Sequence, residues 1–190
     1  MQVSQTRLPG VLLIEPDVRG DARGYFFEAW QRERYREAGI DGEFVQDNVS
    51  FSARGVLRGL HFQHPHAQGK LVYLLQGEVY DVAVDIRRGS PHFGQWVGMM
   101  LSGERKQQLY VPPGFAHGFC VTSETALFAY KCTDRYSPDD EGVIAWDDPA
   151  IGIDWPTREP ELSGRDREAP RLSQLPAQRL PAYPGAEAGR

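Results

Sequence analysis

Four of the five histidines in this chain lie in two short stretches where their imidazoles could do chemistry. His61, His64 and His66 stand close together, and His117 follows in a second stretch. Neutral imidazoles combined with a carboxylate can bind iron, zinc, nickel or manganese. However, the residues just after His66 offer Lys70 rather than a carboxylate, and an ammonium beside a divalent metal would be repelled. Two interpretations therefore stay open: a metal site, or loop histidines at positions 64 and 66 that face the solvent.

Acid–base catalysis is another use of the same region. Along an extended strand Leu60 and His61 point to opposite faces, and a histidine beside a glycine and near Arg58 fits a cavity better than a core. Arg58, His61 and Lys70 together offer one base and two cations, which suits an anionic substrate or an oxyanion that forms during a reaction. Tyr130 ends an apolar strand, where its phenol could donate a proton into a cavity or could be a core group with a hydrogen-bond partner.

Short segments between frequent turn residues indicate an all-β fold that would position these side chains. The chain has 20 glycines and 14 prolines, and brief strands between such residues are typical of sandwiches and jelly-roll barrels. The stretch 78–86 has β-forming residues on both faces, which predicts a central strand. Including this stretch, strands are expected at residues 11–15, 25–30, 44–50, 56–63, 70–75, 78–86, 96–101, 107–111, 118–122, 125–131 and 142–146.

Helices and the end of the chain complete the expected organisation. The only convincing helix is short, at residues 30–38, and it ends at Gly39. Periodicity is lost from about Pro156, and the residues after Pro176 are rich in proline, alanine and glycine. We therefore expect one domain over residues 1–175 and a flexible tail at 176–190. A barrel of this kind can bind a ligand in its mouth, between inward-facing side chains.

The composition excludes several classes of function. With 190 residues, 21 Lys and Arg and 26 Asp and Glu, the formal net charge is −5. Nucleic acid is therefore not expected as a partner, because phosphate binding needs a basic face. No unbroken apolar run exceeds five residues, so no membrane span is expected, and the first residues lack a secretory signal pattern. Cys120 and Cys132 have neither a disulfide framework nor zinc-binding spacing. These features predict a cytoplasmic protein with both cysteines reduced.

Several longer motifs occur at consistent spacing, and together they are far more specific than one short motif. They are Gly20-Asp-Ala-Arg-Gly-Tyr-Phe-Phe-Glu28, Phe44-Val-Gln-Asp-Asn48, Val56-Leu-Arg-Gly-Leu-His61, Gln68-Gly-Lys70, Gly77-Glu-Val-Tyr-Asp-Val-Ala-Val-Asp-Ile86, Pro113-Gly-Phe-Ala-His-Gly-Phe119 and Trp146-Asp-Asp-Pro-Ala-Ile-Gly-Ile-Asp-Trp155-Pro. With these motifs, over about residues 1–170, the chain resembles the dTDP-4-dehydrorhamnose 3,5-epimerases. The resemblance implies a cupin-type double-stranded β-helix, which is a jelly-roll barrel, and a homodimer that uses neither a metal nor another cofactor.

The resemblance also implies a reaction and roles for four residues. The substrate would be dTDP-4-keto-6-deoxy-D-glucose, whose C3–H and C5–H are acidified by the C4 ketone. His61 would be the base, and Asp166 would fix its tautomer and stabilise the imidazolium. Tyr130 would be the acid on the other face of the ring. Lys70 would stabilise the charge on O4 of the enolate.

Further residues match family positions that contact the dTDP-sugar. They are Arg23, Glu28, Gln46, Asn48, Arg58, His117, Tyr136, Glu141 and Arg165. Among them, Arg23 and Arg58 suit pyrophosphate, and Tyr136 would stack on thymine. The chain departs from the family at two positions. Arg135 replaces an aromatic residue found in many relatives, and Arg165 replaces a lysine, which keeps the charge but changes its geometry.

The sequence thus predicts an isomerase of dTDP-L-rhamnose biosynthesis, with a dTDP-linked 4-keto-6-deoxy sugar as its substrate. Its product would need a nicotinamide-dependent 4-keto reductase. Three alternatives remain: an epimerase of C3 or C5 alone, a metal-dependent cupin enzyme that uses the four histidines, and a sugar-binding cupin without catalysis. The same histidine, tyrosine and lysine would serve double and single epimerases, so these residues do not separate the first alternative from the prediction.

Overall fold

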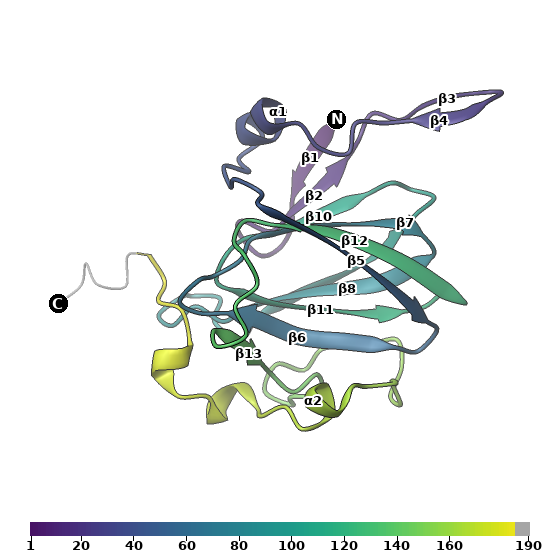
Figure 1. The fold of residues 1–190 in the computed structure, drawn as a ribbon. Helices are drawn as coiled ribbons and strands as arrows, with labels where there is room; N and C mark the ends of the chain where they lie inside the picture. Colours follow the sequence, from purple (N-terminus) through teal and green to yellow (C-terminus); the bar gives the residue numbers. More distant parts are fainter. Residues whose placement is uncertain (185–190) are drawn as a thin grey trace.

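Antiparallel strands make up most of the regular structure between residues 1 and 184, the part of the chain that the computed structural model describes. Two sheets face each other across the barrel (Figure 1). The first has the order β1 (Gln2–Gln5), β2 (Leu12–Glu15), β10 (Gln108–Val111), β7 (Lys70–Gln76), β12 (Thr125–Cys132) and β5 (Gln46–Ala53). The second has the order β13 (Glu141–Val143), β6 (Leu57–Gln63), β11 (Phe115–Val121), β8 (Glu78–Asp85) and β9 (Trp96–Ser102). The predicted all-β class is confirmed.

Apolar side chains fill the barrel and also cover both of its outer faces. Between the sheets pack Val72, Leu74, Val79, Leu109, Phe119 and Phe128 with their neighbours. Behind the second sheet, a second cluster joins Leu60, Val82 and Val84 to residues from the C-terminal part of the chain. β8 contributes to both clusters, with Val79 inside and Val82 outside, so the predicted central strand at 78–86 is an internal strand buried on both faces.

A two-stranded ribbon, β3 (Arg19–Asp21) and β4 (Gly24–Phe26), projects beyond the barrel (Figure 1). The prediction of a strand over 25–30 was wrong beyond Phe26. Tyr25 and Phe26 are 59% and 72% exposed, so these aromatic residues belong to an exposed arm. The helix α1 (Arg32–Glu37) follows and is shorter than expected, because the Gln31 side chain caps it by accepting a hydrogen bond from the Arg34 N–H.

Other strand boundaries differ from the predicted ones by a few residues. β1 was not predicted, β11 begins at Phe115 rather than at 118, and β13 is shorter than the expected strand over 142–146. The C-terminal part holds α2 (Gly164–Arg167) and two 3₁₀ turns, η1 (Leu172–Gln174) and η2 (Ala177–Arg179). Residues 176–184 of the expected tail pack on the second sheet, where Leu180 is buried, and residues 185–190 lie outside the described residues. None of the described helices is long and apolar enough to cross a membrane.

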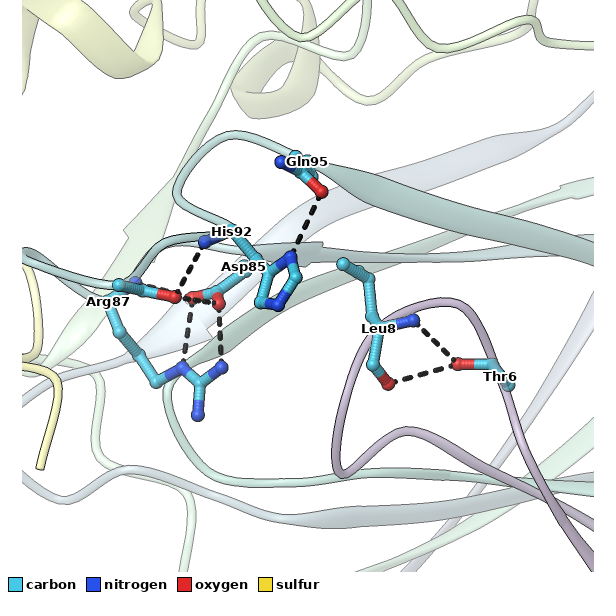
Figure 2. Close-up of polar contacts among 7 residues, drawn as sticks. Thr6, Leu8, Asp85, Arg87, His92 and Gln95 are labelled. Atoms are coloured by element: carbon cyan, nitrogen blue, oxygen red, sulfur yellow. Dashed lines mark hydrogen bonds and ion pairs between the residues drawn. The ribbon is translucent and has the colours of Figure 1, made fainter.

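A buried ion pair fixes the loop that follows β8. Asp85 accepts hydrogen bonds from Arg87 Nε at 2.9 Å and Nη2 at 2.6 Å, and from the Ser90 hydroxyl at 2.6 Å. Figure 2 shows the Arg87 guanidinium facing this carboxylate. Burial raises the pKa of Asp85, but the hydrogen bonds and charge of Arg87 outweigh it, and the pKa lies below its ordinary value of 3.8.

We expect Asp85→Ala to lower the free energy of unfolding by about 3–5 kcal/mol, because it leaves the half-buried Arg87 charge without its partner. The folded-state pKa is depressed, so the stabilisation by Asp85 is fully present above the unfolded-state value of about 4 and is lost as the pH falls below it, through the lower folded-state pKa. Urea unfolding at pH 7 and at pH 3 measures both effects. The exposed Asp147→Ala is the control and should change stability by no more than about 0.5 kcal/mol. Equal losses for the two variants at pH 7 would contradict this assignment.

Candidate active site

A polar cavity of about 210 Å³ opens at one end of the barrel, between the two sheets. β7 begins there with Lys70, β12 ends there after Tyr130, and β6 supplies His61. Seven of the predicted site residues line the cavity: Gln46, Asn48, His61, Lys70, Tyr130, Tyr136 and Glu141. Sequence positions from 46 to 141 therefore meet in one place, as expected for a ligand site in a barrel mouth.

His61 is bonded to a buried carboxylate. Its Nε2 lies 2.6 Å from Asp166 Oδ1, and the Asp166 side chain is 4% exposed. Ser163, the N-cap of α2, fixes Asp166 by accepting its backbone N–H at 3.1 Å. Burial raises the pKa of Asp166, but the hydrogen bond and charge of His61 outweigh it and the pKa is lowered. An ionised Asp166 orients the imidazole and can stabilise the positive charge that a general base gains when it takes a proton.

A β-bulge in β6 places Arg58 and His61 on the same side of the sheet. His61 is paired with His117 of β11, while Arg58 is paired with Phe119, two residues further on. Residues 117 and 119 share a face, so 58 and 61 also share one despite their odd spacing. Gly59 sits in this bulge, where a Cβ would lie 2.5 Å from Gly118 Cα. A second cavity of about 340 Å³ adjoins His61 and is lined by Arg58, Arg165 and Asp166 among others.

Lys70 and Tyr130 stand on neighbouring strands and both reach the cavity. Burial lowers the pKa of Lys70, and the nearby carboxylates of Glu141 and Asp81 offset only part of this effect. Burial likewise raises the pKa of Tyr130, so the phenol keeps its proton at neutral pH. In the described part of the chain no carboxylate lies within ion-pair distance of the Lys70 ammonium. The cavity thus offers a base, a cation and a proton donor.

Side-chain amides hold the loop that carries Tyr136. Gln46 Oε1 accepts the Tyr136 N–H at 2.9 Å, and Gln46 Nε2 donates to Asn48 Oδ1 at 3.0 Å. Gln63 accepts the Ser137 N–H at 2.9 Å and donates to two carbonyl oxygens, so it anchors the same loop. Gln63 was missed as a site residue. Its position two residues after His61 on a predicted strand was the signal, because such residues share a face.

Arg23, Glu28 and His117 do not line these two cavities. Arg23 lies on the projecting ribbon, where it forms an ion pair with Asp21, and the exposed Glu28 pairs with Arg34. His117 is buried on β11, directly opposite His61 in the strand pairing, and its Nε2 lies 2.9 Å from Asp81 Oδ1.

Arg165 contacts Glu141, which also accepts the Tyr136 hydroxyl at 2.7 Å. Arg135, the other departure from the family pattern, is exposed and does not line the cavity.

The histidines that a metal-dependent cupin would need do not converge. His61 and His117 each bond to a separate buried aspartate, and His66 bonds to Asp140 at 2.6 Å. Within residues 1–184, no group of three or more His, Cys, Asp or Glu side chains could hold a metal ion. This arrangement does not support the metal interpretation.

The fold and the site together define the class of protein: a cupin-type jelly-roll barrel whose cavity brings together the side chains that acid–base chemistry needs. A family model described as dTDP-4-dehydrorhamnose 3,5-epimerase matches residues 5–174. The chain belongs to the dTDP-4-dehydrorhamnose 3,5-epimerase family. This membership confirms the predicted 3,5-epimerase activity in dTDP-rhamnose biosynthesis.

Individual relatives and solved structures resemble this chain over most of its length. The curated dTDP-4-dehydrorhamnose 3,5-epimerase of Salmonella typhimurium is 56% identical over 177 residues, covering 92% of this chain and 97% of the relative. The crystal structure of the 3,5-epimerase RmlC from Legionella pneumophila, in complex with dTDP-4-keto-L-rhamnose, has a TM-score of 0.94 and 53% identity, and the match covers 96% of this chain and 98% of that one. ChmJ, a 3'-monoepimerase from Streptomyces bikiniensis in complex with dTDP-quinovose, has a TM-score of 0.87 and 36% identity, covering 96% and 94%.

Proposed function

We propose that this chain inverts C3 and C5 of dTDP-4-dehydro-6-deoxy-D-glucose and gives dTDP-4-dehydro-L-rhamnose, with His61 as base and Tyr130 as acid. The observation that carries the proposal is the single cavity lined by His61, Lys70 and Tyr130, with His61 bonded to Asp166 at 2.6 Å. These groups come from strands of opposite sheets, β6 on one side and β7 and β12 on the other. A sugar ring between the sheets presents one face to each of them.

Each inversion is a balanced proton exchange. His61 takes the proton from a carbon next to the C4 ketone, and the electron pair of the broken C–H bond passes into the enolate, placing negative charge on O4. The Lys70 ammonium stabilises that charge in a partly buried site, where such stabilisation is strong. Tyr130 then gives its phenol proton to the same carbon from the opposite face. Solvent afterwards removes the proton from His61 and returns one to Tyr130, so the enzyme is unchanged.

The nucleotide needs more room than the central cavity provides. A volume of about 210 Å³ is below the roughly 300–1,000 Å³ of usual ligand sites, so we assign this cavity to the sugar ring. The adjoining cavity carries the cations Arg58 and Arg165, which suit a pyrophosphate. Tyr136 is 52% exposed at the rim, and its ring can stack on thymine.

The protein acts as a homodimer in this proposal. Arg23 and Glu28 match substrate-contacting positions of the family, yet they line neither cavity of their own chain. The ribbon that carries Arg23 exposes Tyr25 and Phe26, and a partner subunit would cover these apolar side chains. The ribbon of one subunit then reaches the site of the other. Light scattering after gel filtration measures the mass, and a monomer at micromolar concentration would contradict this assembly.

The reaction also fixes what must follow it. The product retains a ketone at C4, so a nicotinamide-dependent 4-keto reductase must act next, and we place both steps in the cytoplasm. Incubation of the purified protein with the 4-keto sugar nucleotide and such a reductase tests the function. We expect nicotinamide oxidation that requires this protein, whereas oxidation that is independent of it, or absent, would contradict the proposal.

An epimerase of C3 alone is the second candidate, because the structural relative ChmJ is a 3'-monoepimerase with the same fold. The coupled product distinguishes the two activities. A double epimerase yields a 4-keto-L-sugar, and a C3 epimerase yields a 4-keto-D-sugar, which NMR coupling constants of the reduced product identify.

We expect Lys70→Ala to lower kcat by about a hundredfold or more, because it removes the cation that faces the enolate oxygen. The KM should change less, since O4 carries most charge only during the reaction. Lys131→Ala is the matched control. Lys131 is the neighbour of Tyr130 on β12 but pairs with Asp47 at 2.9 Å and does not line the cavity. Steady-state kinetics of both variants measure the effect, and an equal kcat for Lys70→Ala and the wild type would exclude this role.

A further inference from the structure

The last described residues, 176–184, form what we call the C-terminal strap, and they lie outside the region 5–174 that the family model matches. Figure 1 shows this segment running along the same end of the molecule as β13. It is fastened at several points. The Arg88 N–H donates to Pro181 O at 2.8 Å, and the Tyr183 N–H donates to Arg88 O at 2.9 Å. Leu180 is 4% exposed and belongs to the outer apolar cluster.

One side chain of the strap reaches toward the active site. Arg179 Nη1 donates to Asp139 O at 3.1 Å, and Nη2 donates to Glu141 O at 3.0 Å. The carbonyl between them, Asp140 O, accepts the His64 N–H at 3.0 Å. Three consecutive carbonyl oxygens are therefore held, two of them by one guanidinium. The planar fork of an arginine suits two acceptors at fixed positions, which a lysine ammonium cannot hold as rigidly.

The backbone that Arg179 holds carries a cavity residue. The Glu141 carboxylate accepts the Tyr136 hydroxyl at 2.7 Å and contacts the Arg165 guanidinium. Glu141 begins β13, an edge strand of three residues whose only sheet partner among the described strands is β6. Such a short edge strand has few hydrogen bonds to fix where it starts, so the contacts from Arg179 matter for the position of Glu141.

We propose that Arg179 is a positioning residue for the nucleotide half of the site. It acts through the Glu141 backbone and, by way of the Glu141 carboxylate, on Tyr136 and Arg165. It touches none of His61, Lys70 and Tyr130, so it affects binding of the nucleotide rather than the proton transfers. The inference rests on the proposed function, since it assigns Tyr136 and Arg165 to the nucleotide.

Two variants and one control test the inference. Arg179→Ala should raise the KM for the 4-keto sugar nucleotide, and the Kd for dTDP alone, by about five- to tenfold. The kcat should stay within about twofold of the wild type. Arg179→Lys should give an intermediate effect, because one carbonyl can still be bound. Gln178→Ala changes the exposed neighbour of Arg179, which makes no side-chain hydrogen bond among the described residues, and should match the wild type.

The outcomes separate this inference from the proposed function. If the C-terminal strap only stabilises the fold, Arg179→Ala will have a lower melting temperature, but its KM and Kd will be unchanged well below that temperature. This result would overturn the inference. A fall in kcat with unchanged KM would also overturn it. If the wild type neither turns over the sugar nucleotide nor binds dTDP, the proposed function itself fails. If Arg179→Ala does not fold, Arg179→Lys must still show the rise in Kd for dTDP.

Discussion

Replacing His61 with asparagine is expected to lower kcat by about a thousandfold, within the range that general acid–base groups contribute. Asparagine cannot take a proton from C3 or C5, but its amide can still donate to Asp166, so the buried carboxylate keeps a partner. The Kd for dTDP should therefore stay close to that of the wild type. Single-turnover kinetics with the 4-keto sugar nucleotide, together with calorimetry of dTDP binding, measure the two quantities separately.

The control for this variant is His92→Asn. His92 lies in the loop after β8, where Figure 2 shows it beside Gln95. Its replacement by asparagine is the same chemical change at a position outside the cavity. Its kcat should equal that of the wild type. Asp166→Asn should also lower kcat, because the imidazole loses the carboxylate that orients it and that balances the positive charge formed when it takes a proton. A His61→Asn variant with more than about a tenth of wild-type turnover would exclude His61 as the base.

Tyr130→Phe is expected to separate proton removal from inversion. The base remains, so hydrogen at the acidified carbons should still exchange with solvent. The acid on the other face is lost, so kcat for inversion should fall by about a hundredfold or more. In heavy water the recovered sugar nucleotide should carry deuterium with its original configuration. Proton NMR of C3–H and C5–H measures exchange and configuration in one experiment.

Tyr73→Phe is the matched control for the loss of this hydroxyl. Tyr73 lies on β7, next to β12. Its neighbour Val72 faces the barrel interior, so the Tyr73 side chain points to the outer face of the sheet. It should invert the substrate at the wild-type rate. Full inversion by Tyr130→Phe would show that another group delivers the proton. Loss of both solvent exchange and inversion would show that Tyr130 is needed for removal of the first proton as well.

The strand pattern of the barrel could be predicted because burial leaves a local signal. Residues 78–86 place apolar side chains on both faces, and β8 is indeed packed on both. β1 carried no such signal, since its four residues, Gln2–Gln5, are mostly exposed and form an edge strand. The strand predicted over 25–30 was too long, because aromatic residues favour strands whether they pack within the chain or, like Tyr25 and Phe26, project on an exposed arm.

The site itself depends on contacts that local patterns cannot show. Arg58, His61 and Lys70 stand close in sequence, so their residue types alone indicated a shared site. The contact between His61 and Asp166 joins residues 105 positions apart, and only the family resemblance suggested it. Gln63 shares a strand face with His61 and could have been found from that spacing. Arg179 had no such signal, because its importance comes from the backbone carbonyls of a distant loop that it holds.

Deuterium incorporation by the wild-type protein tests the central claim most directly: one site with a base on one face of the sugar and an acid on the other. The purified protein is incubated with dTDP-4-dehydro-6-deoxy-D-glucose in heavy water, and the product is trapped by a 4-keto reductase and examined by NMR. The account predicts solvent deuterium at both C3 and C5, with both centres inverted. Inversion at either carbon without solvent deuterium, or deuterium confined to one carbon, would contradict it.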